Sequence, residues 1–336
     1  MATIKDIAQK AHVSAATVSR ILNQDESLSV TDQTRNRVLK IAEELNYIKK
    51  KPVKNKFTIG IFQWYSLFQE LEDPYYQSIR IGIEHYCTKK QIEVIRAFRS
   101  DSNYAEKLKK VDGLICIGKF NDAEIALFSS ITPYVIFVDM KTKKIHCNTI
   151  VLDFQEAVID ILDYLTSLGH RHIAYLGGRE SLSDDTFYLE ERRESFIQYC
   201  LRHNLCYEPY MKEGEFSAES GYQMTTELIK DGTLPTAIFA ASDPIAIGTM
   251  RALYEHGYCI PEDVSVVGFD DISIASFSNP PLTTVHTPTE FMGEYAAHYI
   301  TLLNQDTEMK YHTPIRLTLP CSLVIRDSCG KPRKEL

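Results

Sequence analysis

Hydrophobic residues near the N-terminus recur with the period of an α-helix in two short runs. The apolar positions of these runs are Ile4, Ile7, Ala8, Ala11, Val18, Ile21 and Leu22. Thr3 is placed to cap a first helix together with Asp6, and Ser14 is placed to cap a second helix that begins at Ala15. His12 interrupts the pattern between them. The pattern therefore predicts two short helices around a tight turn.

The polar face of the second predicted helix carries small or hydrogen-bonding side chains. They are Ala15, Ala16, Ser19, Arg20 and Asn23. Such groups are able to approach base edges in the major groove of DNA, although an ordinary helical hairpin also has a polar face. A third helix is predicted from Thr31 to about Leu45, with Arg35 facing outward as a candidate phosphate contact.

Charge distinguishes this N-terminal part from the rest of the chain. Residues 1–56 contain 11 Lys and Arg and 6 Asp and Glu, so their formal charge is +5. The remaining residues contain 26 basic and 39 acidic side chains, which gives −13 and a total of −8. A basic arm on an acidic body indicates a polyanionic partner for the arm.

The N-terminal sequence resembles the opening of the LacI/GalR family of sugar-responsive repressors. The similarity is carried by Ala-Thr-Ile-Lys-Asp-Ile-Ala at 2–8 and Val-Ser-x-x-Thr-Val-Ser-Arg-x-Leu-Asn at 13–23. It implies a helix-turn-helix DNA-binding domain over residues 1–47 and a homodimer on a palindromic double-stranded operator. The side chains expected at DNA are Thr3, Ser14, Ala15, Ala16, Thr17, Ser19, Arg20, Asn23, Arg35, Lys49, Lys50 and Lys51. Arg20 is the candidate for a bidentate guanine contact.

A basic linker is expected at 48–57, where this sequence departs from the family. Relatives carry a hinge helix here with a leucine that wedges into the minor groove, and this chain lacks that leucine. Lys49, Lys50 and Lys51 are expected to follow the DNA backbone electrostatically, with a plain flexible tether as the alternative.

From residue 58 onward, apolar strand-like runs alternate with amphipathic helical runs. Strands are expected at 58–62, 92–97, 113–117, 134–138, 173–176, 237–240, 264–267, 282–285 and 315–324. Helices are expected at 74–90, 104–110, 121–130, 154–168, 190–203, 218–230 and 243–255. Such alternation predicts an α/β fold of two doubly wound halves. This body, residues 58–336, resembles the type I periplasmic-binding-protein fold and is expected to bind an effector and to dimerise.

The family resemblance also implies a set of sugar-binding side chains. They are Tyr75, Tyr76, Asp139, Arg192, Ser242 and Asp270, with Arg193 as the alternative if the register slips by one residue. Carboxylate and guanidinium groups bind pairs of sugar hydroxyls, and an aromatic ring packs on the C–H face. As alternatives, Asp139 and Asp270 cap the helices or turns that follow their strands.

The effector is expected to be a small sugar. Segments 70–76 and 241–253 resemble galactose repressors and the repressor of the evolved β-galactosidase, which suggests galactose or a β-galactoside. The alternatives are an activator, a regulator that responds to a phosphosugar or a purine, a stand-alone sugar-binding module and a sugar-metabolising enzyme. The sequence contains no catalytic motif, so no enzymatic activity is expected.

Composition is consistent with a cytoplasmic protein. Hydrophobic residues make up 44% of the chain and charged residues 24%, without a membrane-spanning run or a signal peptide. The eight cysteines are scattered, and His170 and His172 have no acidic or thiol residue beside them. We therefore expect no cofactor and no metal. The chain lacks a leucine heptad after Ser328, so a coiled-coil tetramer is not expected.

Overall fold

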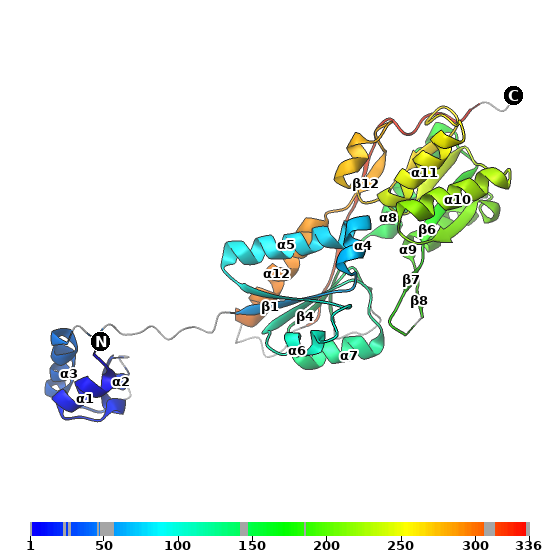
Figure 1. The fold of residues 1–336 in the computed structure, drawn as a ribbon. Coiled ribbons are helices and arrows are strands. Elements are labelled where there is room, and N and C mark those ends of the chain that lie inside the picture. The colour runs from blue at the N-terminus through cyan, green and yellow to red at the C-terminus, as the bar shows by residue number, and fades with distance from the viewer. Residues whose placement is uncertain are drawn as a thin grey trace. The chain divides into compact units, whose positions relative to one another are not determined.

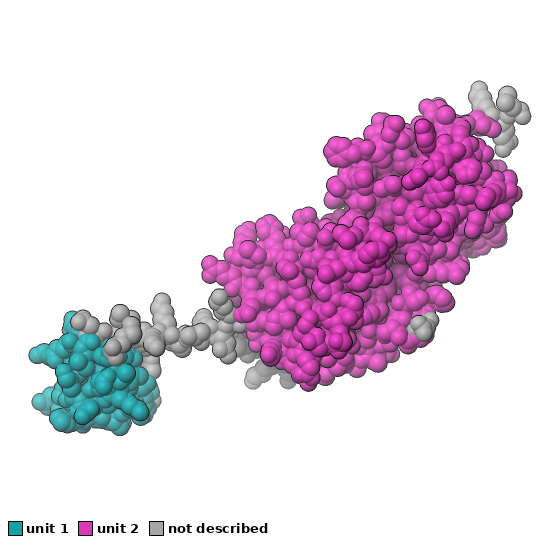
Figure 2. Space-filling view, in the orientation of Figure 1, with its two compact units in different colours: residues 1–56 teal, residues 57–336 magenta. Residues whose placement is uncertain are grey.

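The protein is described by a computed structural model covering residues 2–22, 25, 28–45, 47, 57–141, 147–184, 186–305 and 313–333. The chain forms two compact units, residues 1–56 and residues 57–336, which are coloured separately in Figure 2. Each unit has its own hydrophobic core. The DNA contacts predicted for Asn23 and for Lys49, Lys50 and Lys51 of the linker fall on residues outside the described ranges.

The first unit is a three-helix bundle. Its helices are α1 (Ile4–Ala11), α2 (Ala15–Leu22) and α3 (Asp32–Glu44). The predicted capping box is confirmed, because the Asp6 amide donates to Thr3 Oγ1 and the Thr3 amide donates to Asp6 Oδ2. Ser14 accepts from the amide of Thr17 at 3.0 Å, and His12 ends α1 in the left-handed conformation. Local hydrogen bonds therefore set the ends of α1 and the start of α2.

The second unit consists of two α/β lobes (Figure 1). The sheet of the first lobe is parallel, with strand order β13-β5-β4-β3-β1-β2. Its strands are β1 (Thr58–Gln63), β2 (Glu93–Phe98), β3 (Gly113–Ile117), β4 (Val135–Val138), β5 (Asn148–Leu152) and β13 (Arg316–Leu319). Its helices are α4 (Leu67–Glu72), α5 (Tyr75–Lys90), α6 (Tyr104–Leu108), α7 (Asp122–Ile131) and α12 (Thr289–Gln305). Figure 1 shows α5 and α12 on one face of this sheet and α6 and α7 on the other.

The second lobe has a smaller parallel sheet, with strand order β11-β10-β6-β9. Its strands are β6 (Ile173–Gly178), β9 (Met211–Gly214), β10 (Ala237–Ala240) and β11 (Ser265–Val267). Its helices are α8 (Phe154–Leu168), α9 (Glu191–His203), α10 (Ala218–Lys230) and α11 (Asp243–Glu255). Two-stranded pairs are formed by β7 (Glu180–Ser181) with β8 (Phe187–Tyr188) and by β12 (Thr284–His286) with β14 (Ser322–Val324). Short 3-10 helices lie at Glu208–Tyr210 and Ser273–Phe277.

The chain passes between the lobes at 152–154, 286–289 and 319–322. The single strand predicted over 315–324 is therefore wrong. It is divided into β13 in the first lobe and β14 in the two-stranded sheet. Pro320 lies at the break, and proline cannot donate a ladder hydrogen bond. The prediction also missed α4, α12, β5, β9 and the β7–β8 hairpin.

Close packing of α5 on α12 positions the start of α5, which carries two of the predicted ligand residues. A Cβ atom on Gly82 would lie 2.0 Å from the carbonyl oxygen of Glu290, and one on Gly293 would lie 1.9 Å from that of Ile79. Only glycine allows the two helix backbones to approach this closely. In the part of the chain that the structure describes, no helix is long and apolar enough to cross a membrane.

Candidate functional site

The predicted ligand residues come together in one small cavity, which we call the inner cavity. Its lining residues are Tyr65, Asp73, Tyr75, Tyr76, Asp139, Phe154, Glu180, Arg192, Phe216, Ser242 and Asp270. This set contains every side chain that the resemblance implied, and it is contributed by both lobes. The volume of the cavity is about 20 Å³, close to that of one water molecule. A sugar ring therefore requires the lobes to separate or the side chains to move.

The two predicted aspartates follow buried strands at the carboxyl edge of each sheet. Asp139 comes directly after β4 and has a φ of 65°, and Asp270 follows β11 with a φ of 108°. Left-handed backbone is uncommon for residues other than glycine and concentrates at ligand sites. Ser242 follows β10 and caps α11 by accepting from the Ile245 amide. The carboxyl edge of a doubly wound sheet is where such folds bind ligands.

Asp139 belongs to a buried ion pair that the sequence analysis did not anticipate. Lys119 Nζ lies 2.6 Å from Asp139 Oδ2, and both side chains are almost fully buried. Tyr76 donates to the same oxygen at 3.0 Å. Burial lowers the pKa of Lys119, but the carboxylates of Asp139 and Glu180 raise it more, so its pKa lies above the usual value. Lys119 follows the all-apolar strand β3 by two residues, and this position in the sequence could have indicated a buried cation at the site.

Arg192, rather than Arg193, lies at the inner cavity. Its Nε is 2.6 Å from Glu190 Oε1, and one terminal nitrogen donates to the carbonyl oxygen of Ala241 at 2.7 Å. The guanidinium group lies 4.9–5.3 Å from the ring centres of Phe154, Phe216 and Phe269. The three aromatic rings and the paired carboxylate of Glu190 hold the guanidinium group of Arg192 in one orientation.

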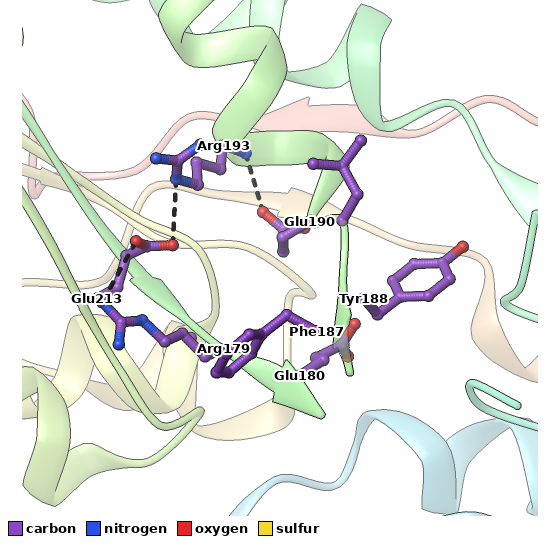
Figure 3. Close-up of a pocket in the computed structure, with 9 residues that line it drawn as sticks. Arg179, Glu180, Phe187, Tyr188, Glu190, Arg193 and Glu213 are labelled. Atoms are coloured by element: carbon purple, nitrogen blue, oxygen red, sulfur yellow. Dashed lines mark hydrogen bonds and ion pairs between the residues drawn. The ribbon is translucent and has the colours of Figure 1, made fainter. Parts of the chain in front are cut away.

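Arg193 faces a separate pocket of about 320 Å³ that is lined only by residues of the second lobe. Figure 3 shows this pocket, with the guanidinium group of Arg193 paired with Glu213 and its backbone amide bonded to Glu190. The Nε–Oε1 distance of the Arg193–Glu213 pair is 3.2 Å. The alternative register is therefore not the one that reaches the inner cavity.

The inner cavity contains more carboxyl groups than cations. Lys119 is paired with Asp139 and Arg192 with Glu190, while Asp73, Glu180 and Asp270 line the cavity as additional buried acids. Burial raises the pKa of Asp73 to about 6 and that of Asp270 well above its usual value. Within the described residues, the Oδ1 atoms of Asp139 and Asp270 and the hydroxyl of Tyr75 have no hydrogen-bond partner. These buried atoms are available to a hydroxyl-rich ligand.

Glu180 is expected to make the stability of the second unit depend on pH. Burial raises its pKa to about 7 from an ordinary 4.5, against a smaller lowering effect of Lys119. Between these two values the folded protein holds a proton that the unfolded chain releases, so the free energy of unfolding falls as pH rises. We expect Glu180→Gln to reduce this slope when thermal midpoints are measured from about pH 5 to pH 8. The matched control is Glu219→Gln, which removes an exposed carboxylate of α10; equal slopes in both variants would contradict the assignment.

The first unit presents the predicted DNA-facing side chains on α2 and α3. Ala15, Ala16 and Arg20 are exposed on α2, whereas Val18 and Ile21 are buried in the three-helix core. Arg20 Nε pairs with Asp25 Oδ2 at 2.7 Å, so a base contact by Arg20 requires this pair to open.

The other side chains of the first unit that were expected at DNA either form hydrogen bonds within the unit or are partly buried. Thr3 and Ser14 use their hydroxyl oxygens as helix caps. Thr17, Ser19 and Arg35 are partly buried.

The histidine pair considered for a metal has a structural role at His170. Its Nδ1 lies 2.9 Å from Thr236 Oγ1, and its Nε2 lies 2.9 Å from the carbonyl oxygen of Gly330. Burial lowers the pKa of His170. Among the described residues, no group of three or more His, Cys, Asp or Glu is arranged to hold a metal ion.

Comparison with known proteins gives matches to both units. Residues 3–50 match the model of bacterial regulatory proteins of the lacI family, and residues 162–329 match that of a periplasmic binding protein-like domain. The chain is 38% identical to the HTH-type transcriptional regulator GalR of Streptococcus thermophilus, over 98% of this chain and 99% of that protein.

Two solved structures cover nearly the whole chain. One is the transcriptional regulator CelR in complex with cellobiose, with 26% identity, a TM-score of 0.69, and coverage of 98% of this chain and 100% of the other. The second is the lac repressor dimer bound to operator and the anti-inducer ONPF, with 28% identity, a TM-score of 0.70, and coverage of 98% and 99%. These matches confirm the predicted N-terminal helix-turn-helix and the predicted two-lobed, periplasmic-binding-protein-like fold class.

Proposed function

The chain belongs to the lacI family of bacterial regulatory proteins, and we propose that it is a cytoplasmic repressor released from a palindromic operator by a sugar. The observation that carries this proposal is the meeting of Tyr75, Tyr76, Asp139, Arg192, Ser242 and Asp270 in one cavity between the lobes. Because both lobes line this cavity and it must open to admit a ligand, effector binding is expected to change the distance or angle between the lobes. A coupling free energy of about 1–3 kcal/mol between sugar and DNA is sufficient for such regulation.

DNA is proposed to be bound by a homodimer, with one α2 helix in the major groove of each half-site. Helix α4 supports a partner surface in the second unit, because Leu67, Phe68 and Leu71 are 60%, 70% and 79% exposed. The exposed alanines of α2 allow close approach to thymine methyl groups, and Arg20 is proposed to bind guanine. The residues at 48–57 are proposed to add electrostatic contacts to the DNA backbone.

The effector is proposed to be an uncharged sugar rather than a phosphosugar. Arg192 at the inner cavity and Lys119 beside it are already paired, with Glu190 and Asp139, so a buried phosphate group would find no further cation among the described lining residues to balance its charge. Carboxylates and an arginine beside tyrosine rings are the groups that hydroxyls and the C–H face of a pyranose require. Galactose or a β-galactoside is our specific proposal, and we propose no catalytic activity.

The test is fluorescence anisotropy of the full chain on palindromic DNA from beside its own gene. We expect tight binding that an uncharged galactoside weakens about tenfold or more, and that galactose 6-phosphate leaves unchanged. The reason is that the phosphate would be buried beside cations that are already paired with carboxylates. Tight DNA binding that ignores every sugar would refute the effector proposal, and release by the phosphosugar alone would refute the charge argument.

A further inference from the structure

A second cavity adjoins the inner cavity, and we call it the outer cavity. Its volume is about 320 Å³, and both lobes line it. Its lining residues are Trp64, Tyr65, Gln69, Glu72, Arg99, Arg179, Glu180, Ser181, Glu215, Phe216 and Ser217. Tyr65, Glu180 and Phe216 also line the inner cavity, so the same side chains form the wall between the two.

Aromatic rings run continuously from the outer cavity to the inner one. The ring centres of Trp64 and Tyr65 are 5.2 Å apart, and those of Tyr65 and Tyr76 are 4.7 Å apart. Tyr76 in turn contacts Tyr75 at 5.0 Å. Such rings provide apolar surface of the kind that the C–H faces of sugar rings pack on.

Phe216 lines both cavities from the second lobe, whereas Trp64, Tyr65 and Tyr76 belong to the first lobe. It comes from the loop between β9 and α10, and the Arg192 guanidinium group lies 5.0 Å from its ring. On the neighbouring strand, Gly177 and Gly178 are the last two residues of β6. A Cβ atom on Gly178 would lie 2.2 Å from the Phe216 ring, so glycine at this position lets the ring sit at the shared wall.

Polar groups accompany the rings in the outer cavity. Arg99 donates to Glu124 at 2.9 Å, and its guanidinium group lies 5.6 Å from the Trp64 ring. Among the described residues, the buried Nε of Arg99 has no hydrogen-bond partner. Glu72 and Ser181 are exposed and come from opposite lobes. Hydrogen-bonding groups beside a stacking surface are the combination that binds a sugar ring.

The pocket of Figure 3 is a weaker candidate for an extension of the site. It shares Glu180 with the inner cavity, but the second lobe supplies its whole lining. The outer cavity shares a wall of three residues with the inner cavity and is formed by both lobes. A ligand that fills both cavities therefore contacts both lobes along its full length.

We propose that the effector is a glycoside of at least two sugar rings, with one ring in the inner cavity and the next in the outer cavity. This inference rests on the proposed function, because it extends the same effector site. The first ring uses the buried acids and Arg192. The second ring packs along Trp64 and Tyr65 and bonds with the polar groups of the outer cavity.

The experiment is isothermal titration calorimetry of the full chain with galactose, glucose, lactose, cellobiose and melibiose. We expect at least one disaccharide to bind about tenfold or more tightly than either of its own monosaccharides, because a second ring adds hydrogen bonds and stacking. Ser181→Trp fills the outer cavity from an exposed position and should remove this difference while leaving monosaccharide binding unchanged. Ser167→Trp, at an exposed position of α8 outside the cavity linings, is the matched control.

The possible results separate this inference from the proposed function. Monosaccharides that bind as tightly as every disaccharide would overturn the two-ring effector and leave sugar regulation standing. A disaccharide preference that Ser181→Trp does not reduce would overturn the assignment of the outer cavity. If none of the five sugars binds, the proposed galactoside effector fails together with this inference.

Discussion

Replacement of Arg192 by alanine is expected to abolish effector binding and to lower the free energy of unfolding by about 3–5 kcal/mol. The buried carboxylate of Glu190 would lose its cation, and the rings of Phe154, Phe216 and Phe269 would lose the group that they enclose. The described lining of the inner cavity would then hold four carboxyl groups (Asp73, Asp139, Glu180 and Asp270) and no cationic side chain. Calorimetric sugar titration and denaturant unfolding measure the two effects separately.

Two further variants keep this prediction testable if the alanine variant does not fold. Arg192→Lys retains the charge beside Glu190 but lacks the planar fork, so we expect a folded protein with weakened sugar binding. Arg193→Ala removes the neighbouring arginine, whose partners Glu194 and Glu213 are partly exposed, and should change little. Normal sugar affinity in the lysine variant, or greater loss in Arg193→Ala, would show that Arg192 does not hold the effector.

Replacement of Arg20 by alanine is expected to lower the preference for operator over unrelated DNA. A bidentate arginine–guanine contact contributes about 1–3 kcal/mol of discrimination, which corresponds to roughly fivefold to 150-fold in affinity. Arg20 lies on the exposed face of α2, outside the core formed by Val18 and Ile21. The fold and the sugar binding of the second unit should therefore remain unchanged.

The comparison variant is Arg37→Ala on α3, which removes the same charge from an exposed position of the first unit. A lost phosphate contact weakens specific and non-specific binding about equally and reduces the salt dependence of both. Anisotropy on operator and scrambled DNA at several salt concentrations distinguishes these outcomes. If Arg20→Ala behaves like Arg37→Ala, the base contact is made by another residue.

The segments that join the lobes lie directly beside the inner cavity. Phe154, which lines the cavity, begins α8 immediately after the first passage between lobes. Asp270 bridges to His286 at the second passage. A ligand that moves these residues therefore acts on the connections that set the angle between lobes, and we expect this angle to carry the response to the DNA-binding unit.

Sequence alone determined the elements whose causes are local. Thr3 with Asp6, and Ser14 with Thr17, make hydrogen bonds between residues three positions apart, so the caps of the first unit were predictable. The alternation of apolar runs predicted most strands and helices of the two lobes. It did not predict the division of 315–324 between two sheets, because the partners of β13 and β14 are distant in the chain.

The family resemblance supplied six site residues, but their surroundings were decided by tertiary structure. The bond from Tyr76 to Asp139 joins residues 63 positions apart, and the bond from Tyr76 to Glu180 joins residues 104 positions apart. Lys119 and Phe216 reach the site in the same way, from the ends of separate strands. A local sequence pattern cannot predict contacts between residues so far apart in the chain. Parallel strands from remote parts of the chain bring their carboxyl ends to one edge only when the sheets assemble. The charge balance and the two-cavity shape of the site are therefore properties of the folded unit.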